Sequence, residues 1–301
     1  ADMAPGAEIH CIKVLDTVDL QNATAYIATN NISIVNHSVG WVLASYYDDT
    51  GWINAIVNNS RDNDGVFWSL SAGNQALRHW RGGWVDDDAD DFLDFATNDD
   101  RLDITSQYST VQLFLNWDQY SNSLTDLDLY IYDKDDLVVA SSTGPQSGAE
   151  TPTEAVTFTL DTNLTPYTIE VHAFSGPTND LDITIFSFNN NLEHAVAASA
   201  FLDPANAHGS YTVAAVNQAV WTDSNPPVAS YSSNGPTNDG RQKPNITAPD
   251  GTVTRTYGAS FGTSFSAPTV AGAAALLLDE DPTRTAGDLE ARLTALAEDI
   301  G

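Results

Sequence analysis

A serine at position 264 stands at the start of a long run of small and apolar residues, within the segment 262–272. Ala, Val and Leu dominate this run up to Asp279, which predicts a buried helix that begins near Ser264. Thr263 and Ser264 suit a helix start, and Pro268 is expected in the first turn. Unpaired N–H groups and the helix dipole favour negative charge there, so the hydroxyl could be a nucleophile whose attack creates an oxyanion. A serine that caps a core helix is the alternative.

The sequence Gly-Thr-Ser-Phe-Ser-Ala-Pro at 262–268, followed by Val-Ala-Gly at 270–272, resembles the nucleophile motif of the subtilisin-like serine proteases, the subtilases. This motif is long and specific. Segments 230–237, 239–241 and 243–249 also resemble stretches that the family carries before its serine. The resemblance implies endopeptidase chemistry, in which a polypeptide substrate is hydrolysed through an acyl-enzyme on Ser264.

Asn74 is the expected oxyanion donor. It ends the segment Ser-Ala-Gly-Asn after an apolar run, and this segment resembles the family's Ala-Gly-Asn stretch. A side-chain amide suits the task because it donates a hydrogen bond without titrating. By the same resemblance, Ser38, Val39 and Gly40 border the substrate, together with Gly73. An ordinary turn asparagine after a glycine is the alternative for residue 74.

A serine nucleophile also needs a base and a group that orients the base. In subtilases the aspartate and histidine motifs lie upstream of a turn that residues 4–7 resemble, and none of the six histidines here lies in such a motif. His37 is the nearest substitute, although a strand histidine is more often structural. We therefore expect residues 1–301 to hydrolyse peptides poorly alone. A missing N-terminal segment or a separate N-terminal chain would supply the Asp and the His, and neighbouring subunits are the alternative partners.

A different class of function is a non-catalytic relative that serves extracellular binding or assembly. A sugar-binding module is a third class, and it rests on fold analogy alone.

Alternating strand and helix patterns at both ends of the chain predict an α/β fold, a subtilisin-like parallel sheet flanked by helices. Strands are expected at 8–15, 32–36, 66–70 and 210–216. Helices are expected after a cap at Asp19, from Trp52 to Asn59, and at 286–296.

The middle of the chain follows a different pattern. Apolar residues such as Val111, Leu113 and Leu115 alternate with polar ones, and turn residues separate the runs. This predicts an inserted antiparallel β-sandwich of jelly-roll type at 103–190, between two parts of the core at 1–102 and 191–301.

Two acidic stretches are candidates for calcium. Asp126 and Asp128 lie in a Thr-Asp-Leu-Asp-Leu-Tyr strand that resembles one in small β-sandwich domains of secreted proteases, and that resemblance implies a calcium role. Alternation places both side chains on one face. The acidic run 86–91 is a second candidate, and a solvated acidic surface is the alternative in both cases. No organic cofactor is expected.

The charge balance excludes some partners. The chain has 41 acidic and 11 basic residues, a net charge of -30. Such a field repels nucleic acid and anionic membranes and suits a salty or calcium-containing medium. The resemblance to the subtilases implies a secreted protein, so we expect an extracellular location. The longest apolar run, 270–278, is too short for a membrane span. Cys11 is the single cysteine and is expected in the core. The sequence reads as a processed or trimmed product.

Overall fold

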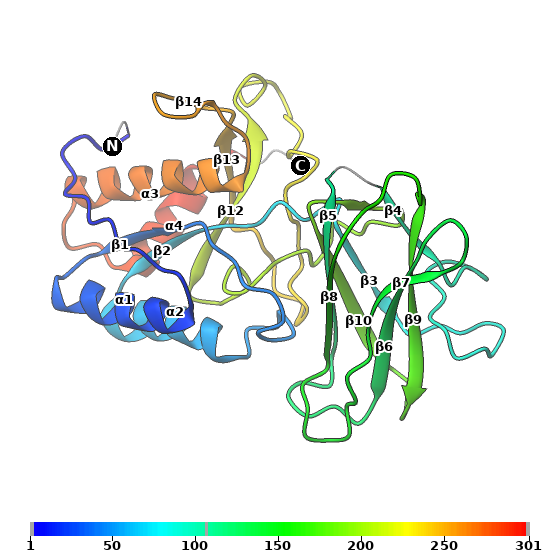
Figure 1. Cartoon of the computed structure of the whole chain (residues 1–301). Helices are drawn as coiled ribbons and strands as arrows, with labels where there is room; N and C mark the ends of the chain where they lie inside the picture. Colours follow the sequence, from blue (N-terminus) through cyan, green and yellow to red (C-terminus); the bar gives the residue numbers. More distant parts are fainter. Residues whose placement is uncertain (1–2, 106–107, 299–301) are drawn as a thin grey trace. The chain divides into compact units, whose positions relative to one another are not determined.

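The computed structural model describes residues 3–105 and 108–298, which divide into two compact units (Figure 1). Unit 1 comprises residues 1–74 and 201–301, and unit 2 comprises residues 75–200. The sequence analysis placed the first boundary after residue 102, whereas unit 2 begins at residue 75. It placed the second boundary after residue 190, whereas unit 2 ends at residue 200. The difference arises because β3 (His79–Gly83) pairs with β10 (Asp182–Phe188) and so is a strand of unit 2.

Unit 1 contains a four-stranded parallel sheet in the order β1-β2-β12-β13. Its strands are β1 (Ile34–His37), β2 (Phe67–Ser71), β12 (Ser210–Asn217) and β13 (Ile246–Asp250). Its helices are α1 (Thr17–Thr29), α2 (Trp52–Asp64), α3 (Thr263–Glu280) and α4 (Ala286–Leu296). A two-stranded hairpin, β14 (Val253–Thr254) and β15 (Gly258–Ala259), precedes α3.

The helices cover both faces of this sheet (Figure 1). On one face, α1 and α2 bury Leu20 and Ile53 against Trp68. On the other face, α3 and α4 bury Val270 and Leu289 in the cluster that contains the neighbouring strand residue, Phe67. Successive residues of β2 therefore serve opposite cores, as they must in a strand that is buried on both sides.

The strand expected at 8–15 does not form. Residues 8–15 have no regular structure, and the side chains of Ile9 and Leu15 are 61% and 72% exposed. A period-two pattern becomes a strand only when a neighbouring strand accepts its backbone hydrogen bonds, and no described strand pairs with this segment. Cys11 is consequently exposed, which corrects the expectation that it belongs to the core.

The N-cap of α1 is Asp16 and not Asp19. The Asp16 carboxylate accepts a 2.8 Å hydrogen bond from the backbone N–H of Asp19, three residues into the helix. Asp19 lies in the first turn, where its negative charge interacts favourably with the positive end of the helix dipole.

Unit 2 consists of two antiparallel sheets that share one core. The first has the order β3-β10-β5-β8 and the second the order β11-β4-β9-β6-β7. The additional strands are β4 (Leu102–Thr105), β5 (Thr110–Trp117), β6 (Asp126–Tyr132), β7 (Val138–Ser142), β8 (Thr153–Thr159), β9 (Tyr167–Ser175) and β11 (Asn191–Leu192). Leu113 and Leu115 of β5 are buried in the same cluster as Leu129 of β6 and Ile169 of β9. The parallel sheet with helices and the separate antiparallel sheets confirm the predicted fold class.

Within the described residues, no helix is both long and apolar enough to cross a membrane.

Candidate functional site

Helix α3 begins at Thr263, and its cap is built from backbone and distant side chains. The N-cap Gly262 has φ 127°, a conformation that favours glycine, and this residue has no side chain that could cap the helix. The Gly262 N–H lies 2.7 Å from an oxygen of Asp250, which is buried at the end of β13, and 3.1 Å from the Tyr231 hydroxyl. Tyr231 donates its own hydrogen bond to the same carboxylate.

This arrangement corrects two expectations. Neither Thr263 nor Ser264 caps the helix with its side chain. Pro268 lies in the second turn, because the helix starts one residue before Ser264.

Asn74 is tied to the first residue of α3. Its side-chain oxygen accepts hydrogen bonds from the backbone N–H of Thr263 at 3.0 Å and from the Thr263 hydroxyl at 3.2 Å. That hydroxyl also accepts from the N–H of Gly73 at 3.1 Å, and Thr263 is fully buried. A Cβ on Gly262 would lie 3.3 Å from the Asn74 Nδ2, so a larger residue at position 262 would crowd this amide. The turn after β2 and the N-terminus of α3 are thereby fixed to each other.

Two hydrogen-bond donors remain uncommitted at this helix end. Among the described residues, neither the Asn74 Nδ2 nor the Ser264 backbone N–H takes part in a hydrogen bond. The next N–H, that of Phe265, is occupied by the Gly262 carbonyl at 2.9 Å. Ser264 itself is half-buried. The site therefore presents a hydroxyl, a backbone N–H and a side-chain amide at the positive end of an 18-residue helix.

His37 lies in β1 and does not join this group. Its side chain is 8% exposed and stacks on Trp41, with ring centroids 5.5 Å apart. Burial lowers the pKa of His37 to about 4, although a hydrogen bond with the Val39 backbone acts in the opposite direction. All six histidines lie within the described residues, and none of them forms a hydrogen bond with Ser264.

The expected substrate-bordering residues follow β1 at the carboxyl edge of the sheet. Because β1 and β2 are parallel neighbours, Ser38, Val39 and Gly40 leave the sheet at the same edge as Gly73 and Asn74. Val39 is 50% exposed, and a Cβ on Gly40 would lie 2.9 Å from the Leu202 Cβ. A cavity of about 410 Å³ in unit 1 lies beside β1 and is lined by residues of α1 and α3, and Ser264 is not among its lining residues.

Asp203, a buried carboxyl group whose backbone pairs with that of Trp41, was not predicted from the sequence. It accepts hydrogen bonds from the Ser45 hydroxyl at 2.8 Å and from the side-chain amides of Asn54 and Asn206, each at 2.9 Å. Burial raises the pKa of Asp203 to about 6, in spite of these three donors. The partners are far apart in the chain, so no local pattern could reveal the cluster.

The carboxylates of Asp126 and Asp128 lie on β6 and are each 5% exposed. Asp126 accepts from the Gln146 N–H at 3.2 Å, and Asp128 accepts from the Tyr130 hydroxyl at 3.0 Å. The nearest histidine nitrogen, Nδ1 of His172, is 4.0 Å from Asp128. These are oxygen donors of the type that calcium prefers, but two carboxylates supply few of the six to eight ligands it takes.

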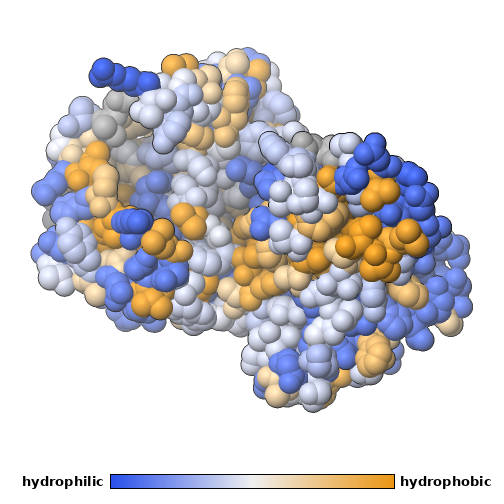
Figure 2. Space-filling model, viewed as in Figure 1, coloured by the Kyte–Doolittle hydropathy of each residue, from blue (hydrophilic) through white to orange (hydrophobic). Residues whose placement is uncertain are grey.

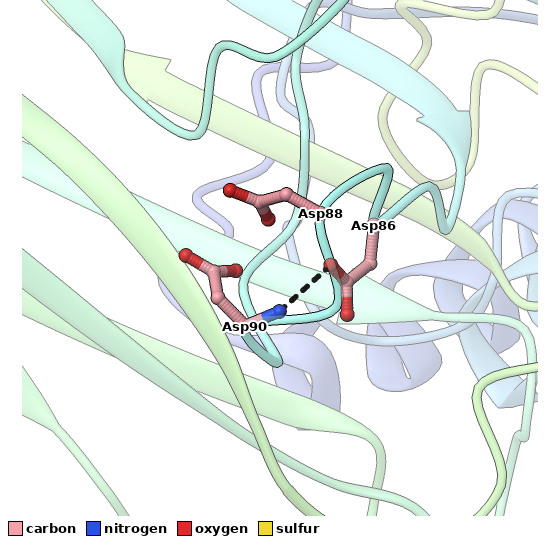
Figure 3. A group of neighbouring side chains, drawn as sticks. All are labelled: Asp86, Asp88 and Asp90. Carbon is pink, nitrogen blue, oxygen red and sulfur yellow. Dashed lines mark hydrogen bonds between the residues drawn. The ribbon is translucent and has the colours of Figure 1, made fainter.

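A tighter acidic group occurs in the loop after β3. Asp86, Asp88 and Asp90 each offer a carboxylate oxygen, and these oxygens lie within 4.8 Å of one another (Figure 3). The Asp90 N–H donates to Asp86 at 3.1 Å, which folds the loop back on itself. Partial desolvation and the neighbouring carboxylates raise the pKa of Asp88. All three side chains contact solvent, so the geometry suits a hard cation without requiring one.

A profile of the subtilase family, Peptidase S8, matches residues 118–300. The chain therefore belongs to the subtilase family. Among solved structures, the CspB protease of Clostridium perfringens is similar with a TM-score of 0.65 and 15% identity, over 97% of this chain and 68% of that one. At this identity the likeness shows the fold alone.

Two other solved structures are similar at a lower level. A cold-adapted subtilisin-like serine proteinase has a TM-score of 0.40 and 14% identity, over 96% of this chain and 57% of that one. A psychrophilic protease designated S41 has a TM-score of 0.44 and 13% identity, over 93% of this chain and 55% of that one. This chain thus spans little more than half the length of these two proteases. No curated protein matches it.

Proposed function

We propose that this chain carries the nucleophile and the oxyanion-binding groups of a subtilisin-like serine endopeptidase. The observation that supports this is the Asn74–Thr263 hydrogen bond, which holds a side-chain amide one residue from Ser264. The Ser264 Oγ attacks the carbonyl carbon of a peptide bond and gives its proton to a base. The oxyanion then accepts hydrogen bonds from the Ser264 N–H and the Asn74 Nδ2. The C–N bond breaks as the amine takes the proton, and water hydrolyses the acyl-enzyme.

We propose that the base and its orienting acid come from another polypeptide segment. His37 is a poor base because its imidazole is buried against Trp41 and Trp68 and has a low pKa. Without a base and its acid, a serine protease site retains only ~10³–10⁴-fold catalysis over water. The described chain should therefore hydrolyse polypeptides slowly when it is alone.

A serine-directed fluorophosphonate tests this proposal. Wild-type protein should react slowly at Ser264, and Ser264→Ala should not react. The matched control is Ser266→Ala, which removes a buried hydroxyl of the same helix that has no hydrogen-bond partner in the described part of the chain. Rapid reaction of the wild-type chain alone would contradict the need for an external base. Equal labelling of Ser264→Ala would contradict the proposed nucleophile.

A second candidate function is extracellular binding or assembly through unit 2. The supporting observation is the edge strand β7, where Val138, its first residue, is 50% exposed and the preceding Leu137 is 62% exposed. Figure 2 shows apolar surface gathered over the region of β7 and β9. A double variant, Leu137→Lys with Val138→Lys, should then abolish any concentration-dependent association in light scattering. Unchanged association would exclude this surface.

We also propose that the protein works outside the cell and binds calcium. The net charge of -30 and the all-oxygen acidic groups support both proposals. Immunodetection in culture medium against cell lysate tests the first.

A further inference from the structure

His208 lies in the segment 201–209, which leads into β12, and both nitrogens of its ring face a carboxylate. The Nδ1 is 2.7 Å from an oxygen of Asp49, and the Nε2 is 2.9 Å from an oxygen of Asp62. The backbone N–H of His208 donates a further 2.9 Å hydrogen bond to the other oxygen of Asp49. One histidine thus joins three parts of unit 1: the segment 41–51 that follows β1, helix α2 and the segment before β12.

The charge state of this ring follows from its contacts. An ionised carboxylate only accepts hydrogen bonds, so a ring nitrogen beside it must carry a hydrogen. A neutral imidazole has one N–H and would direct the lone pair of its other nitrogen at the second carboxylate. Only the imidazolium satisfies both contacts, because it donates from both nitrogens at once.

A side-chain amide supports the same junction. The Asn58 amide of α2 donates a 2.9 Å hydrogen bond to the Asp49 carboxylate, and its oxygen accepts the Gly209 N–H at 2.8 Å. The contacts of the segment 201–209 with α2 and with the segment 41–51 therefore share the Asp49 carboxylate, so a change at the ring also affects its neighbours.

In the part of the chain that the structure describes, the charged groups that face the ring are the two aspartates. Behind them, Arg61 lies 3.1 Å from Asp62 and 3.1 Å from Glu290 of α4. Asp49 interacts electrostatically with the buried Lys243. The basic groups thus hold the carboxylates, and none of them takes the place of the imidazolium between the two.

These contacts set the sign of the pH dependence. Partial burial lowers the pKa of His208, but the hydrogen bonds and charges of Asp62 and Asp49 outweigh it, so the pKa is raised above its ordinary value of 6.5. The stability that this ring contributes is therefore fully present below pH 6.5 and is lost as the pH rises through the folded-state pKa. The hydrogen bond from His208 lowers the pKa of Asp62, so Asp62 stays ionised throughout this window.

We propose that His208, Asp49 and Asp62 form a pH-sensitive clamp, which holds the segment 41–51 against α2 when the ring is protonated and releases it when the ring loses its proton. Deprotonation turns one of the two attractive contacts into a repulsion between a lone pair and a carboxylate. The residues 41–51 contain neither a helix nor a strand, so side-chain contacts of this kind decide how firmly they are held.

The clamp lies next to the expected substrate-bordering residues. The segment 41–51 directly follows Ser38, Val39 and Gly40, and the segment 201–209 carries Leu202, which a Cβ on Gly40 would contact. Release of the clamp should therefore loosen the edge where a peptide would lie. This consequence rests on the proposed function, whereas the clamp itself does not.

Nuclear magnetic resonance of the ring nitrogens tests the clamp directly. Below pH 6.5 both nitrogens of His208 should carry a proton, and the ring should titrate above this value. Asp62→Asn removes one facing charge and should lower the titration midpoint by about 1 pH unit. The matched control is Asp64→Asn, which removes the same charge from an exposed position of α2 and should leave the midpoint nearly unchanged.

Hydrogen exchange at single amides measures the release. In the wild type, the protection of the His208 and Gly209 amides, relative to their intrinsic exchange rates, should fall by about tenfold as the ring titrates. In His208→Gln the protection should not depend on pH in this window, and the amide of Ala274 in the core of α3 should be unaffected in both proteins. If melting curves show that His208→Gln does not fold, Asp62→Asn takes its place, and its protection should fall at lower pH than in the wild type.

Three results would overturn the clamp. They are a single protonated ring nitrogen below pH 6.5, a midpoint that Asp64→Asn lowers as much as Asp62→Asn does, and amide protection that does not follow the ring.

The link to the site is tested separately with a peptide boronate, which adds to a serine hydroxyl. Its affinity for the wild type, relative to His208→Gln, should fall as the ring loses its proton. A constant ratio would remove the link to the substrate edge, although the clamp itself would stand. Absence of boronate binding to either protein at any pH would instead reject the proposed nucleophile.

Discussion

The backbone N–H of Thr263 donates a 3.0 Å hydrogen bond to the side-chain oxygen of Asn74. This contact orients the amide, because an oxygen that is engaged by Thr263 leaves the Nδ2 group as the free end. It also joins residues that are far apart in sequence into one rigid corner beside Ser264. The proposed chemistry depends on this corner, since an oxyanion donor helps only when it is held in place before the reaction.

Asn74→Asp and Asn74→Ala should separate the two roles of this side chain. Aspartate keeps an oxygen for the Thr263 N–H but removes the Nδ2 donor, so stability should change little. Alanine removes both and should cost about 1–3 kcal/mol of unfolding free energy. Both variants should weaken binding of a peptide boronate, which adds to the serine hydroxyl as a transition-state analogue, by ~10²-fold or more. Titration by boron NMR measures this, and unchanged affinity in Asn74→Asp would exclude an oxyanion role.

Asp203→Asn should change the pH dependence of stability. The folded-state pKa of Asp203 is about 6, above its ordinary value of 3.8, so the folded chain holds an extra proton between these limits. The stabilising contribution of the protonated Asp203 side chain is thus present at low pH and is lost as the pH rises from about 4 to 6. The stability of Asp203→Asn relative to wild type should rise by up to about 3 kcal/mol across this window and then level off.

Urea unfolding at a series of pH values measures this difference. Among the described residues, the buried side-chain oxygens of Asn54 and Asn206 have no hydrogen-bond partner, so they can accept from an amide at position 203. The low pKa of His37 acts with the opposite sign over a similar range, but it cancels in the comparison of the two proteins. A pH-independent difference would show that the carboxyl group is ionised throughout.

Gly176→Ala should destabilise unit 2 severely. Gly176 has φ 96°, and a Cβ there would lie 2.3 Å from the Leu124 carbonyl oxygen, which belongs to the backbone and cannot rotate away. Gly148→Ala is the matched control in the same unit, because its φ is 103° but its nearest contact, at 3.4 Å, is the end of a leucine side chain. We expect a cost of about 1–2 kcal/mol for the control and clearly more for Gly176→Ala. Hydrogen exchange in β5 and β6 monitors unit 2, and equal effects of the two variants would contradict the crowding.

Calcium should raise the melting temperature if an acidic group binds it. Binding to the folded state alone stabilises it by mass action, and the shift should grow with calcium concentration and disappear with a chelator. Asp88→Asn should abolish the shift if the loop of Asp86, Asp88 and Asp90 is the site. Asp126→Asn with Asp128→Asn should abolish it if the β6 pair is the site. Differential scanning fluorimetry distinguishes the two, and no shift at millimolar calcium would reject both.

The sequence predicted the elements whose signals are local. The apolar run after Ser264 indicated α3, and the glycine and asparagine after an apolar strand indicated the turn at Asn74. Leu289 and Leu293 mark the buried stripe of α4, which begins and ends where the pattern placed it. In each case the side chains that decide the structure are near one another in the chain, so their periodicity is visible in the sequence.

Contacts between distant segments decided the rest. Asp250 and Tyr231, not a local serine or threonine, hold the cap of α3. The pattern at 8–15 predicted a strand, but a strand requires a partner edge, and that requirement cannot be read from its own residues. Asp203 became a buried, protonatable group only because folding placed Ser45, Asn54 and Asn206 around it. The sequence by itself therefore determined which residues are candidates for the chemistry, whereas the tertiary structure determined what holds them, because hydrogen bonds and burial depend on neighbours in space.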